Sequence, residues 1–346
     1  MNFMKRTLFA VVCSLYSLSF FAQTENEGLV KWLTIKEAQE KYKEVPKPIL
    51  LDIYTDWCGW CKHMMRTTYS NAGLAQYINT NFYPVKFDAE TKDTIVYDGK
   101  TYKPTSPAPK TPHELAIKFL GDKLSYPSTM FIANNYQFNL LTQGYLEDKK
   151  IEPILVFMVE NAWQTAVFDE FNKHFTQTFL DTNYKKIPVP YVDIKQLEKV
   201  QKKKPKKTLI CIGADFCNTG KVMFKTSFTD TCIGNYINKN FNVVLFNAAS
   251  TDTILFKNEK HFNTPINNFP FNTLAFKLTN NRLTLPSLCV LDEDLNLIDV
   301  LGFYQSPERL KPILTYIASN SYKDKTKTFN DFMQEEYLKG AVKQKK

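Results

Sequence analysis

The chain has 346 residues, of which 44% are hydrophobic and 23% are charged. This balance is typical of globular proteins and excludes long disordered, collagen-like and multi-pass membrane chains, while the length favours two domains of ordinary size. The net charge of +9 comes largely from lysine runs at 202–207 and 323–346. Charge runs of this kind are usually solvated faces, so we expect no nucleic-acid partner.

The first 22 residues have the pattern of a secretory signal peptide. Lys5 and Arg6 form a basic segment, residues 7–21 are apolar, and Ala22-Gln23 is a plausible cleavage point. A bilayer span needs about 20 apolar residues, so a cleaved signal is favoured over a membrane anchor. We expect a periplasmic or secreted protein, whose cysteines meet an oxidising compartment. Membrane contact would come only from an uncleaved signal or the basic tail.

The chain matches itself nearly without gaps at an offset of 159 residues. The matched positions include Asp56 with Asp215, Cys58 with Cys217, Lys62 with Lys221, Asn79 with Asn238 and Pro127 with Pro286. A repeat of this length predicts two copies of one domain. We place the copies at 28–164 and 191–320, with a helical connection at 165–190 and a basic tail at 321–346.

In the first copy, apolar runs typical of strands alternate with segments of helical spacing. We predict strands at 49–54, 82–87, 129–133 and 140–141, and helices at 58–68 and 151–163. Residues 97–102 predict an inserted hairpin, because their Asp-Gly pair favours a tight primed turn. A parallel strand–helix–strand unit followed by a hairpin and a helix is an α/β arrangement, with a central mixed β-sheet flanked by helices.

Two cysteines separated by two residues, Cys58 and Cys61, lie where the strand at 49–54 turns into a helix. Unpaired backbone N–H groups and the helix dipole favour negative charge there, so we expect Cys58 to be the thiolate and Cys61, one turn in, to be more buried. A static disulfide and half of a metal site are the alternatives. Because the chain has no second Cys-x-x-Cys and its four histidines form no cluster, we expect a redox pair and no metal.

The segment that ends in Trp57-Cys58-Gly59-Trp60-Cys61-Lys62 resembles the active-site region of the thioredoxin-like superfamily, and most of all its exported members. Two further hallmarks of that family match. Asp52 stands at the position of the family's buried acid, six residues before Cys58, and Pro127 stands at the position of its cis-proline, 69 residues after Cys58. The resemblance covers about 30–164 and, more weakly, 190–319. It implies an α/β fold with two tandem thioredoxin-like domains.

The resemblance implies a role for each matched residue. Cys58 would attack a substrate disulfide, Cys61 would resolve the mixed disulfide, and Asp52 would accept the proton that Cys61 loses. Pro127, if cis, would free neighbouring backbone groups to pair with an extended substrate segment. Substrate would be bound by Trp57, Gly59, Trp60 and Tyr126. The implied partners are protein thiols or disulfides and a redox partner protein, with no cofactor beyond the dithiol.

The second copy keeps the framework but not the pair. Gly220 stands in place of Cys61 and Cys211 in place of Asp52, while Cys217 and Pro286 keep the 69-residue spacing. We interpret this copy as a degenerate structural domain or a peptide-binding module, ahead of a one-thiol redox site. In predicted strands, Cys211 and Cys289 are most simply small core hydrophobes. A structural disulfide could nevertheless form among four cysteines, with the pairing left open: Cys211, Cys217, Cys232 and Cys289.

We therefore expect an exported thiol–disulfide oxidoreductase that exchanges disulfides with protein substrates through Cys58 and Cys61. The buried acid and the resemblance favour a reductase. Gly59-Trp60 differs from the Gly-Pro of thioredoxin, which leaves the redox potential open. The alternative hypothesis is a non-catalytic tandem scaffold that binds extended polypeptides. A disulfide isomerase is a third hypothesis, in which the second copy supplies a peptide-binding domain.

Overall fold

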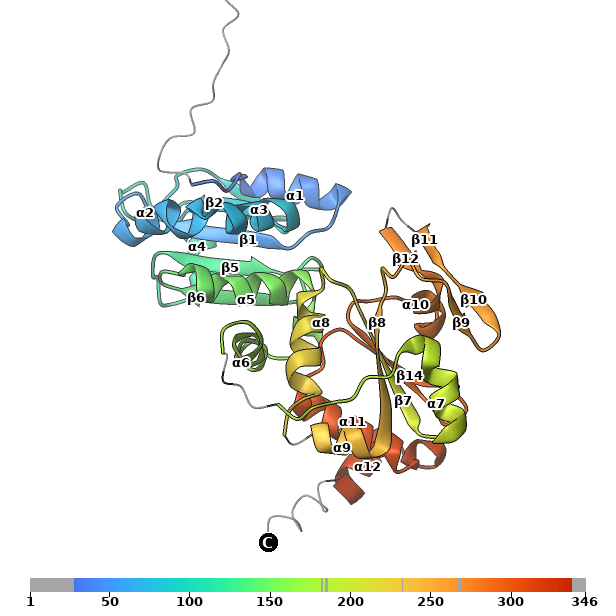
Figure 1. The fold of residues 1–346 in the computed structure, drawn as a ribbon. Coiled ribbons are helices and arrows are strands. Elements are labelled where there is room, and N and C mark those ends of the chain that lie inside the picture. The colour runs from blue at the N-terminus through green and yellow to red at the C-terminus, as the bar shows by residue number, and fades with distance from the viewer. Residues whose placement is uncertain (1–27, 182, 184–185, 232, 267–268, 338–346) are drawn as a thin grey trace, which may run out of the picture.

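The computed structural model describes residues 28–337 apart from 182, 184–185, 232 and 267–268. The predicted signal peptide at 1–22 and Cys232 therefore lie outside the described residues. Within the described part of the chain, no helix is both long enough and apolar enough to cross a membrane. Figure 1 shows two sheets, each with helices on both sides, one in the blue-to-green part of the chain and one in the yellow-to-red part.

The first copy contains a four-stranded sheet made of β1 (Ile49–Tyr54), β2 (Tyr83–Asp88), β5 (Ser128–Ile132) and β6 (Asn139–Gln143). The strand order is β2-β1-β5-β6, with β1 parallel to β2 and antiparallel to β5, which is antiparallel to β6. Strand β1 is buried from Ile49 to Ile53. Burial on both faces explains why its sequence is a continuous apolar run interrupted only by Asp52.

Helices cover the two faces of this sheet. One face packs against α1 (Ile35–Glu44) and α4 (Glu114–Leu120), and the other against α2 (Gly59–Arg66), α3 (Ala72–Asn81) and α5 (Asp148–Val159). Ile49, Leu51 and Ile53 belong to the cluster with α1 and α4, whereas Leu50 belongs to the cluster with α2, α3 and α5. Since side chains alternate along a strand, Asp52 faces the same helices as Leu50.

The second copy repeats this sheet in the order β8-β7-β13-β14. Its strands are β7 (Lys207–Gly213), β8 (Phe241–Asn247), β13 (Ser287–Leu291) and β14 (Leu297–Gly302). Its helices are α7 (Leu197–Lys203), α8 (Asn218–Val222), α9 (Gly234–Asn240), α10 (Thr273–Leu278) and α11 (Pro307–Ala318). The directions of pairing are also the same. The expected fold class, with two mixed sheets flanked by helices, is confirmed, and the boundaries of the two copies stay a prediction.

Small hairpins are inserted before α4 and α10. The first pairs β3 (Ile95–Tyr97) with β4 (Lys100–Tyr102), and its turn residues Asp98 and Gly99 both have positive φ, 50° and 70°. This is the geometry that a primed turn requires, so the predicted hairpin is confirmed. The second copy repeats it with β9 (Ile254–Phe256) and β10 (Glu259–His261), and adds β11 (Asn263–Ile266) and β12 (Phe269–Asn272).

Two helices end earlier than the sequence analysis predicts. The helix expected to reach Thr68 stops at Arg66, and the 3-10 turn η1 (Thr68–Ser70) follows. The helix expected at 151–163 begins already at Asp148 and stops at Val159. Glu160 caps it, and Asn161 adopts a left-handed conformation with φ of 55°. A left-handed residue ends the helical hydrogen-bond ladder, which places Glu160 at the surface of α5 where it can meet the second copy.

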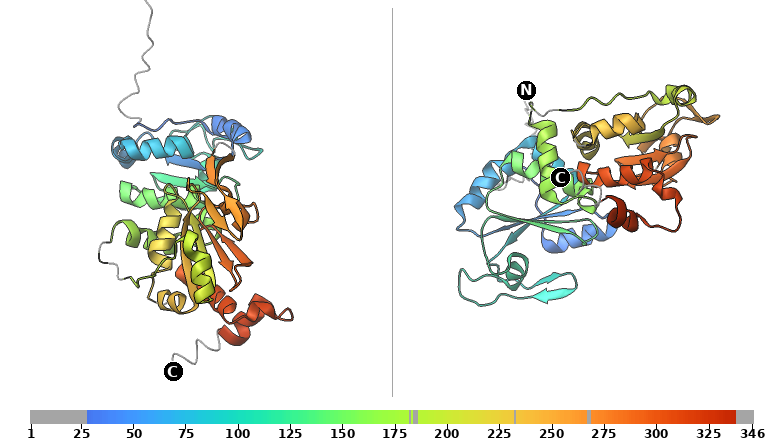
Figure 2. Two further views of the ribbon diagram at one scale, coloured as in Figure 1. Left: turned by 45° about the vertical axis from the view of Figure 1, so that its right-hand side comes forward. Right: turned by 90° about the horizontal axis from the view of Figure 1, so that it is seen from below.

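The connection between the copies contains α6 (Phe168–Phe179), as its composition predicts. Its buried Phe171 contacts Phe157 of α5 on one side and Tyr304, just before α11, on the other, each with ring centroids 5.3 Å apart. The hydrophobic cluster around these rings is continuous from the first copy to the second. The view from below in Figure 2 shows the two copies side by side.

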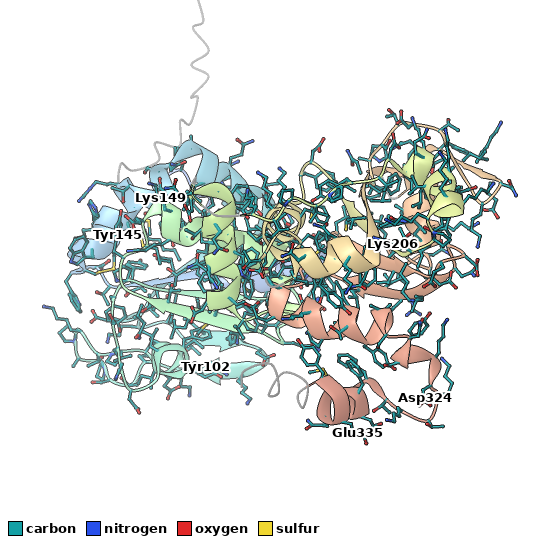
Figure 3. All side chains as sticks on the ribbon, turned by 60° about the horizontal axis from the view of Figure 1, so that its bottom comes forward. Tyr102, Tyr145, Lys149, Lys206, Asp324 and Glu335 are labelled. Carbon is teal, nitrogen blue, oxygen red and sulfur yellow. A yellow bond between two sulfur atoms is a disulfide. The ribbon has the colours of Figure 1, made fainter. Side chains whose placement is uncertain are left out.

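The described part of the C-terminal tail packs against α11. It contains the turn η5 (Ser321–Lys323), helix α12 (Phe329–Phe332) and a final turn η6 (Met333–Tyr337). Tyr316 of α11 contacts the rings of Phe329 and Phe332 at 5.3 and 5.1 Å. Figure 3 labels Asp324 and Glu335 on the solvent side of this segment. The tail is thus attached by aromatic contacts, while its charged side chains remain exposed.

Candidate active site

Cys58 and Cys61 form a disulfide at the start of α2, with Cα atoms 5.3 Å apart. The chain leaves β1 in a turn in which the Cys58 N–H donates to the Thr55 carbonyl. Cys58 is the N-cap of α2, and its Sγ accepts the Cys61 N–H at 3.1 Å. On reduction, this N–H and the helix dipole stabilise a Cys58 thiolate. The two cysteines are buried to a similar degree, with 4% and 3% exposed, so the expectation that Cys61 is distinctly more buried is wrong.

Aromatic side chains surround the disulfide. Trp57 and Trp60 are 55% and 60% exposed, unusually so for tryptophan. Trp57 meets Tyr126 edge to face at 6.0 Å, and Trp60 lies 5.8 Å from Tyr145, which is labelled in Figure 3. His63 completes this side of the rim at 5.1 Å from Tyr145. The structure thus brings together three of the four predicted substrate-binding side chains around the pair.

The fourth predicted substrate-binding residue is Gly59, in the first turn of α2. A Cβ placed on it would meet no atom within 4 Å, so the backbone is open to solvent beside the disulfide. The Tyr126–Pro127 peptide bond, at the entrance to β5, is cis. The Pro127 carbonyl accepts the N–H of Gly144 at 2.8 Å. Pro127 thereby stands where β5 and the end of β6 meet, next to the Tyr126 ring of the rim.

Two residues of the rim were missed by the sequence analysis, Tyr145 and Glu90. The Trp57 indole N–H donates to Glu90 Oε1 at 3.0 Å, which fixes the orientation of an otherwise exposed ring. Glu90 follows β2 and belongs to an acidic group with Asp88 and Asp56. Burial raises the pKa of Asp88, and the Asp56 and Glu90 charges raise it further against a hydrogen bond from the Glu90 N–H. These residues are 33 positions or more away from the disulfide partners they flank or lie outside the motif, so no local signal marks them.

Asp52 is buried beneath α2, with 1% of its surface exposed. Its Oδ1 accepts the Tyr69 hydroxyl at 3.4 Å, and its Oδ2 has no hydrogen-bond partner among the described residues. Burial raises the pKa of Asp52 to about 7, although the positive charge of Lys86 and the Tyr69 hydrogen bond oppose this rise. A carboxyl with such a pKa can both accept and return a proton near neutral pH.

The equivalent position of the second copy is closed. Cys217 is again the N-cap of a helix, α8, and its Sγ accepts the Gly220 N–H at 3.3 Å. Here the carboxylate of Glu160, from the end of α5, accepts the N–H groups of Asn218 and Thr219 at 2.9 and 2.7 Å. Burial, and then the Glu160 charge, raise the pKa of Cys217 to about 12. The thiol is therefore neutral at physiological pH and is a poor nucleophile.

The remaining cysteines of the second copy are free thiols within the described part of the chain. Cys211 and Cys289 are fully buried in β7 and β13, as expected for small core hydrophobes. Cys217 is also unpaired. The suggested structural disulfide among the four cysteines is thus not formed by the three that are described. The same residues include no group of three or more His, Cys, Asp or Glu placed to hold a metal ion.

The fold and the disulfide at the start of α2 define the class: a thioredoxin-like α/β protein with an active-site type of Cys-x-x-Cys pair. The chain belongs to the thioredoxin-like superfamily. Residues 15–103 match the family model Thioredox_DsbH, described as "Protein of unknown function, DUF255".

Three similar proteins place the chain further. An uncharacterized protein of Archaeoglobus fulgidus is 31% identical over 90 residues, which is 26% of this chain and 68% of that protein. An uncharacterized protein of Caenorhabditis elegans is 33% identical over 60 residues, 17% of this chain, and the match spans only 8% of that relative's length. The structure of a thioredoxin-fold protein from Helicobacter pylori covers 49% of this chain and 93% of its own, at 18% identity and a TM-score of 0.30.

Proposed function

We propose that this protein is a thiol–disulfide oxidoreductase that acts on protein substrates through Cys58 and Cys61. The observation that carries the proposal is the position of the pair, at the N-terminus of α2 and above a buried carboxyl, Asp52, whose pKa is raised to about 7 by burial. A purely structural disulfide needs neither an adjacent titratable acid nor a surrounding ring of exposed tryptophans. Perturbed acids of this kind cluster at functional sites.

The proposed reaction transfers two electrons from the dithiol to a substrate disulfide. The Cys58 thiolate attacks one sulfur of the substrate, a mixed disulfide forms, and the other substrate sulfur leaves as a thiolate that is protonated by water. Cys61 then gives its proton to Asp52 and attacks the Cys58 sulfur. The second substrate sulfur leaves, the Cys58–Cys61 disulfide closes, and Asp52 releases the proton to solvent. A dithiol partner protein must reduce the pair again, and no cofactor enters either step.

The rim favours polypeptide substrates. Trp57, Trp60 and Tyr126 offer apolar surface with fixed orientations on both sides of the disulfide, and Gly59 leaves the space above the helix open. Aromatic side chains of this kind bury large areas at a small entropic cost and are enriched at binding sites. An extended segment that carries a cysteine fits such a surface. The Pro127 backbone would then lie along that segment.

We also propose that residues 28–164 and 191–320 are two thioredoxin-like domains, of which only the first reacts. Glu160 fills the helix N-terminus of the second site, which argues against both a one-thiol redox site and peptide binding there. The second copy then serves as a scaffold that supports the first. Export, to the periplasm or the medium, is proposed from residues 1–22, and N-terminal sequencing of the mature protein from fractionated cells tests it.

The central experiment measures the reduction potential of the pair in redox buffers, together with reduction of a disulfide-bonded test protein such as insulin. We expect a potential near the thioredoxin end of the known range, about −270 mV. Cys58→Ser should lower insulin reduction to the background rate, and Cys61→Ser should accumulate mixed disulfides through Cys58. A pair that stays oxidised below about −300 mV and reduces nothing would show a structural disulfide, and the scaffold hypothesis would replace this proposal.

A further inference from the structure

A layer of polar side chains lies beneath the disulfide in the first copy. Asp52 pairs in register with Lys86 on β2 and with Thr129 on β5. Tyr69, from η1, reaches over the sheet and donates its hydroxyl to Asp52 Oδ1. Its hydroxyl also interacts with that of Thr129. Tyr69 is fully buried, and its ring packs edge to face against Trp32 at 4.8 Å.

The second copy has an apolar layer at the same place. Cys211 pairs in register with Leu245 on β8 and with Leu288 on β13, in the same positions that Lys86 and Thr129 take around Asp52. At the repeat offset of 159 residues, Tyr69 corresponds to Phe228, which is also fully buried. Four polar side chains have thus been replaced together in the copy that lost its second cysteine, while the strand pairing is unchanged.

Phe228 shows what this position needs for packing alone. A phenylalanine fills the equivalent site in a folded copy, so the aromatic ring is sufficient for the core. The Tyr69 hydroxyl adds a polar group to a buried site, which is unfavourable unless it is hydrogen-bonded. Its acceptor is the Asp52 carboxyl. The hydroxyl is therefore explained by Asp52 and not by the stability of the core.

We propose that Tyr69 is a positioning residue of the exchange reaction: its hydroxyl holds Asp52 Oδ1, so that Oδ2 is left to accept the proton of Cys61. The role rests on the proposed function. When Cys61 attacks the Cys58 sulfur of a mixed disulfide, the Cys61 S–H bond breaks, its proton passes to Oδ2, and the electron pair of the broken S–S bond leaves with the substrate sulfur. Tyr69 keeps its own proton throughout, because its phenol is buried beside a carboxylate.

The hydroxyl also affects when Asp52 can act as a base. A donated hydrogen bond favours the charged form of a carboxyl, so its loss favours the protonated form. The other groups that face Asp52 are the positive charge of Lys86 from β2, the uncharged hydroxyl of Thr129 from β5 and the cysteine pair of α2. None of these changes when only the Tyr69 hydroxyl is removed. Any change in the titration of Asp52 can therefore be assigned to that one bond.

The test is Tyr69→Phe, read as the single-turnover rate of mixed-disulfide resolution against pH. We expect the rising limb of the profile, set by ionisation of Asp52, to move up by about one pH unit, with rates up to about tenfold lower on that limb and equal at the plateau. A matched control is Tyr304→Phe, since Tyr304 is an equally buried tyrosine whose hydroxyl bonds His174 in the second copy. That variant should leave the profile unchanged.

The outcomes separate this inference from the proposed function. If wild type reduces insulin and Tyr69→Phe shows an unchanged pH profile, Tyr69 has only a structural role and the inference is overturned alone. If wild type does not exchange disulfides at all, the proposed function fails and this role fails with it. Should Tyr69→Phe fold poorly, Thr129→Val gives the second readout, with a smaller shift in the same direction expected. An unshifted profile for Thr129→Val would then overturn the inference.

Discussion

The two copies place a cysteine at the same point of the same fold, and yet only one of them is suited to attack a disulfide. Cys58 and Cys217 both cap a helix, and both accept the N–H of the residue three positions later. Around Cys58 the helix N-terminus remains available to stabilise a thiolate. Around Cys217 the Glu160 carboxylate already occupies it. The difference teaches that a helix N-terminus activates a thiol only when no other anion is bound there.

The layer below the cysteine matters as much as the helix above it. The first copy keeps a titratable carboxyl there, held by Tyr69 and faced by Lys86. The second copy replaces the carboxyl with Cys211, whose thiol has its pKa raised far above the usual value by burial. A resolving cysteine in the second copy would have no base to receive its proton. Loss of the pair and loss of the base are therefore two parts of one change.

Replacement of Asp52 by asparagine should have the largest effect on this contrast. Burial raises the pKa of Asp52 to about 7, above its value in the unfolded chain, so the folded protein binds the extra proton between about pH 4 and 7. Wild type therefore loses stability as the pH rises through this window, by up to about 4 kcal/mol, and Asp52→Asn should not lose it. Urea unfolding at pH 4 and pH 8 measures the difference.

The sign is specific for the Asp52 prediction. Asp52→Asn should be the more stable protein at pH 8 and should approach wild type at pH 4, while resolution of mixed disulfides becomes slow at every pH. Asp56→Asn is the matched control, because Asp56 is exposed in the loop after the same strand. Parallel stability curves for wild type and Asp52→Asn would show that this carboxyl titrates as an ordinary acid.

Neutralising Glu160 should bring the second site closer to the first. The Glu160 charge is the second cause, after burial, of the high pKa of Cys217. In Glu160→Gln, alkylation of Cys217 at pH 8 should be about threefold to tenfold faster, with the Cys58–Cys61 pair kept oxidised. The helix cap is weakened as well, by about 1 kcal/mol. Mass spectrometry of the labelled peptide follows the rate.

Glu152→Gln provides the control for that experiment, since Glu152 is an exposed residue of the same helix, α5. It should leave the labelling of Cys217 unchanged. Equal labelling of Cys217 in wild type and Glu160→Gln would mean that burial alone protects the thiol. Glu160 would then be a helix cap and nothing more.

Restoring the pair in the second copy should have the smallest effect on activity. A Cβ at position 220 would lie 3.1 Å from Cys217 Sγ, so Gly220→Cys brings a second thiol within reach. We expect a disulfide to form with Cys217, seen as the loss of two alkylatable thiols, and no insulin reduction in a Cys58→Ser background. The apolar layer of Cys211, Leu245 and Leu288 explains this inactivity. Measurable reduction would show instead that two cysteines on this scaffold are sufficient.

Much of the site in the first copy could be predicted from sequence because its spacing along the chain is fixed by the fold. The positions of Cys58, Cys61 and Pro127 follow from a strand, a turn and a helix of standard lengths, and the repeat exposed the two sheets. Glu160 could not be found in this way, because its contact joins residues 58 and 59 positions apart across the two copies. A helix cap that comes from another part of the chain leaves no periodic pattern.

Tyr69 is an intermediate case. It lies 17 residues after Asp52, outside the motif, and in the first copy alone it looks like any core aromatic. The alignment of the two copies did contain a signal, since a buried tyrosine faces a buried phenylalanine at the same offset as Asp52 and Cys211. Only the register of β1 with β2 and β5 shows that these replacements surround one atom group. Sequence comparison finds the differences, and strand pairing shows which of them belong together.

The continuous core from Phe157 through Phe171 to Tyr304 has a consequence for the history of the chain. After a duplication, a redundant copy that is merely tethered can be deleted without harm. Here the inert copy covers aromatic surface of α5 and α6 that would otherwise be in water. Losing its chemistry was tolerated, whereas losing its polypeptide would have removed half of a shared hydrophobic core. The duplication thereby became irreversible.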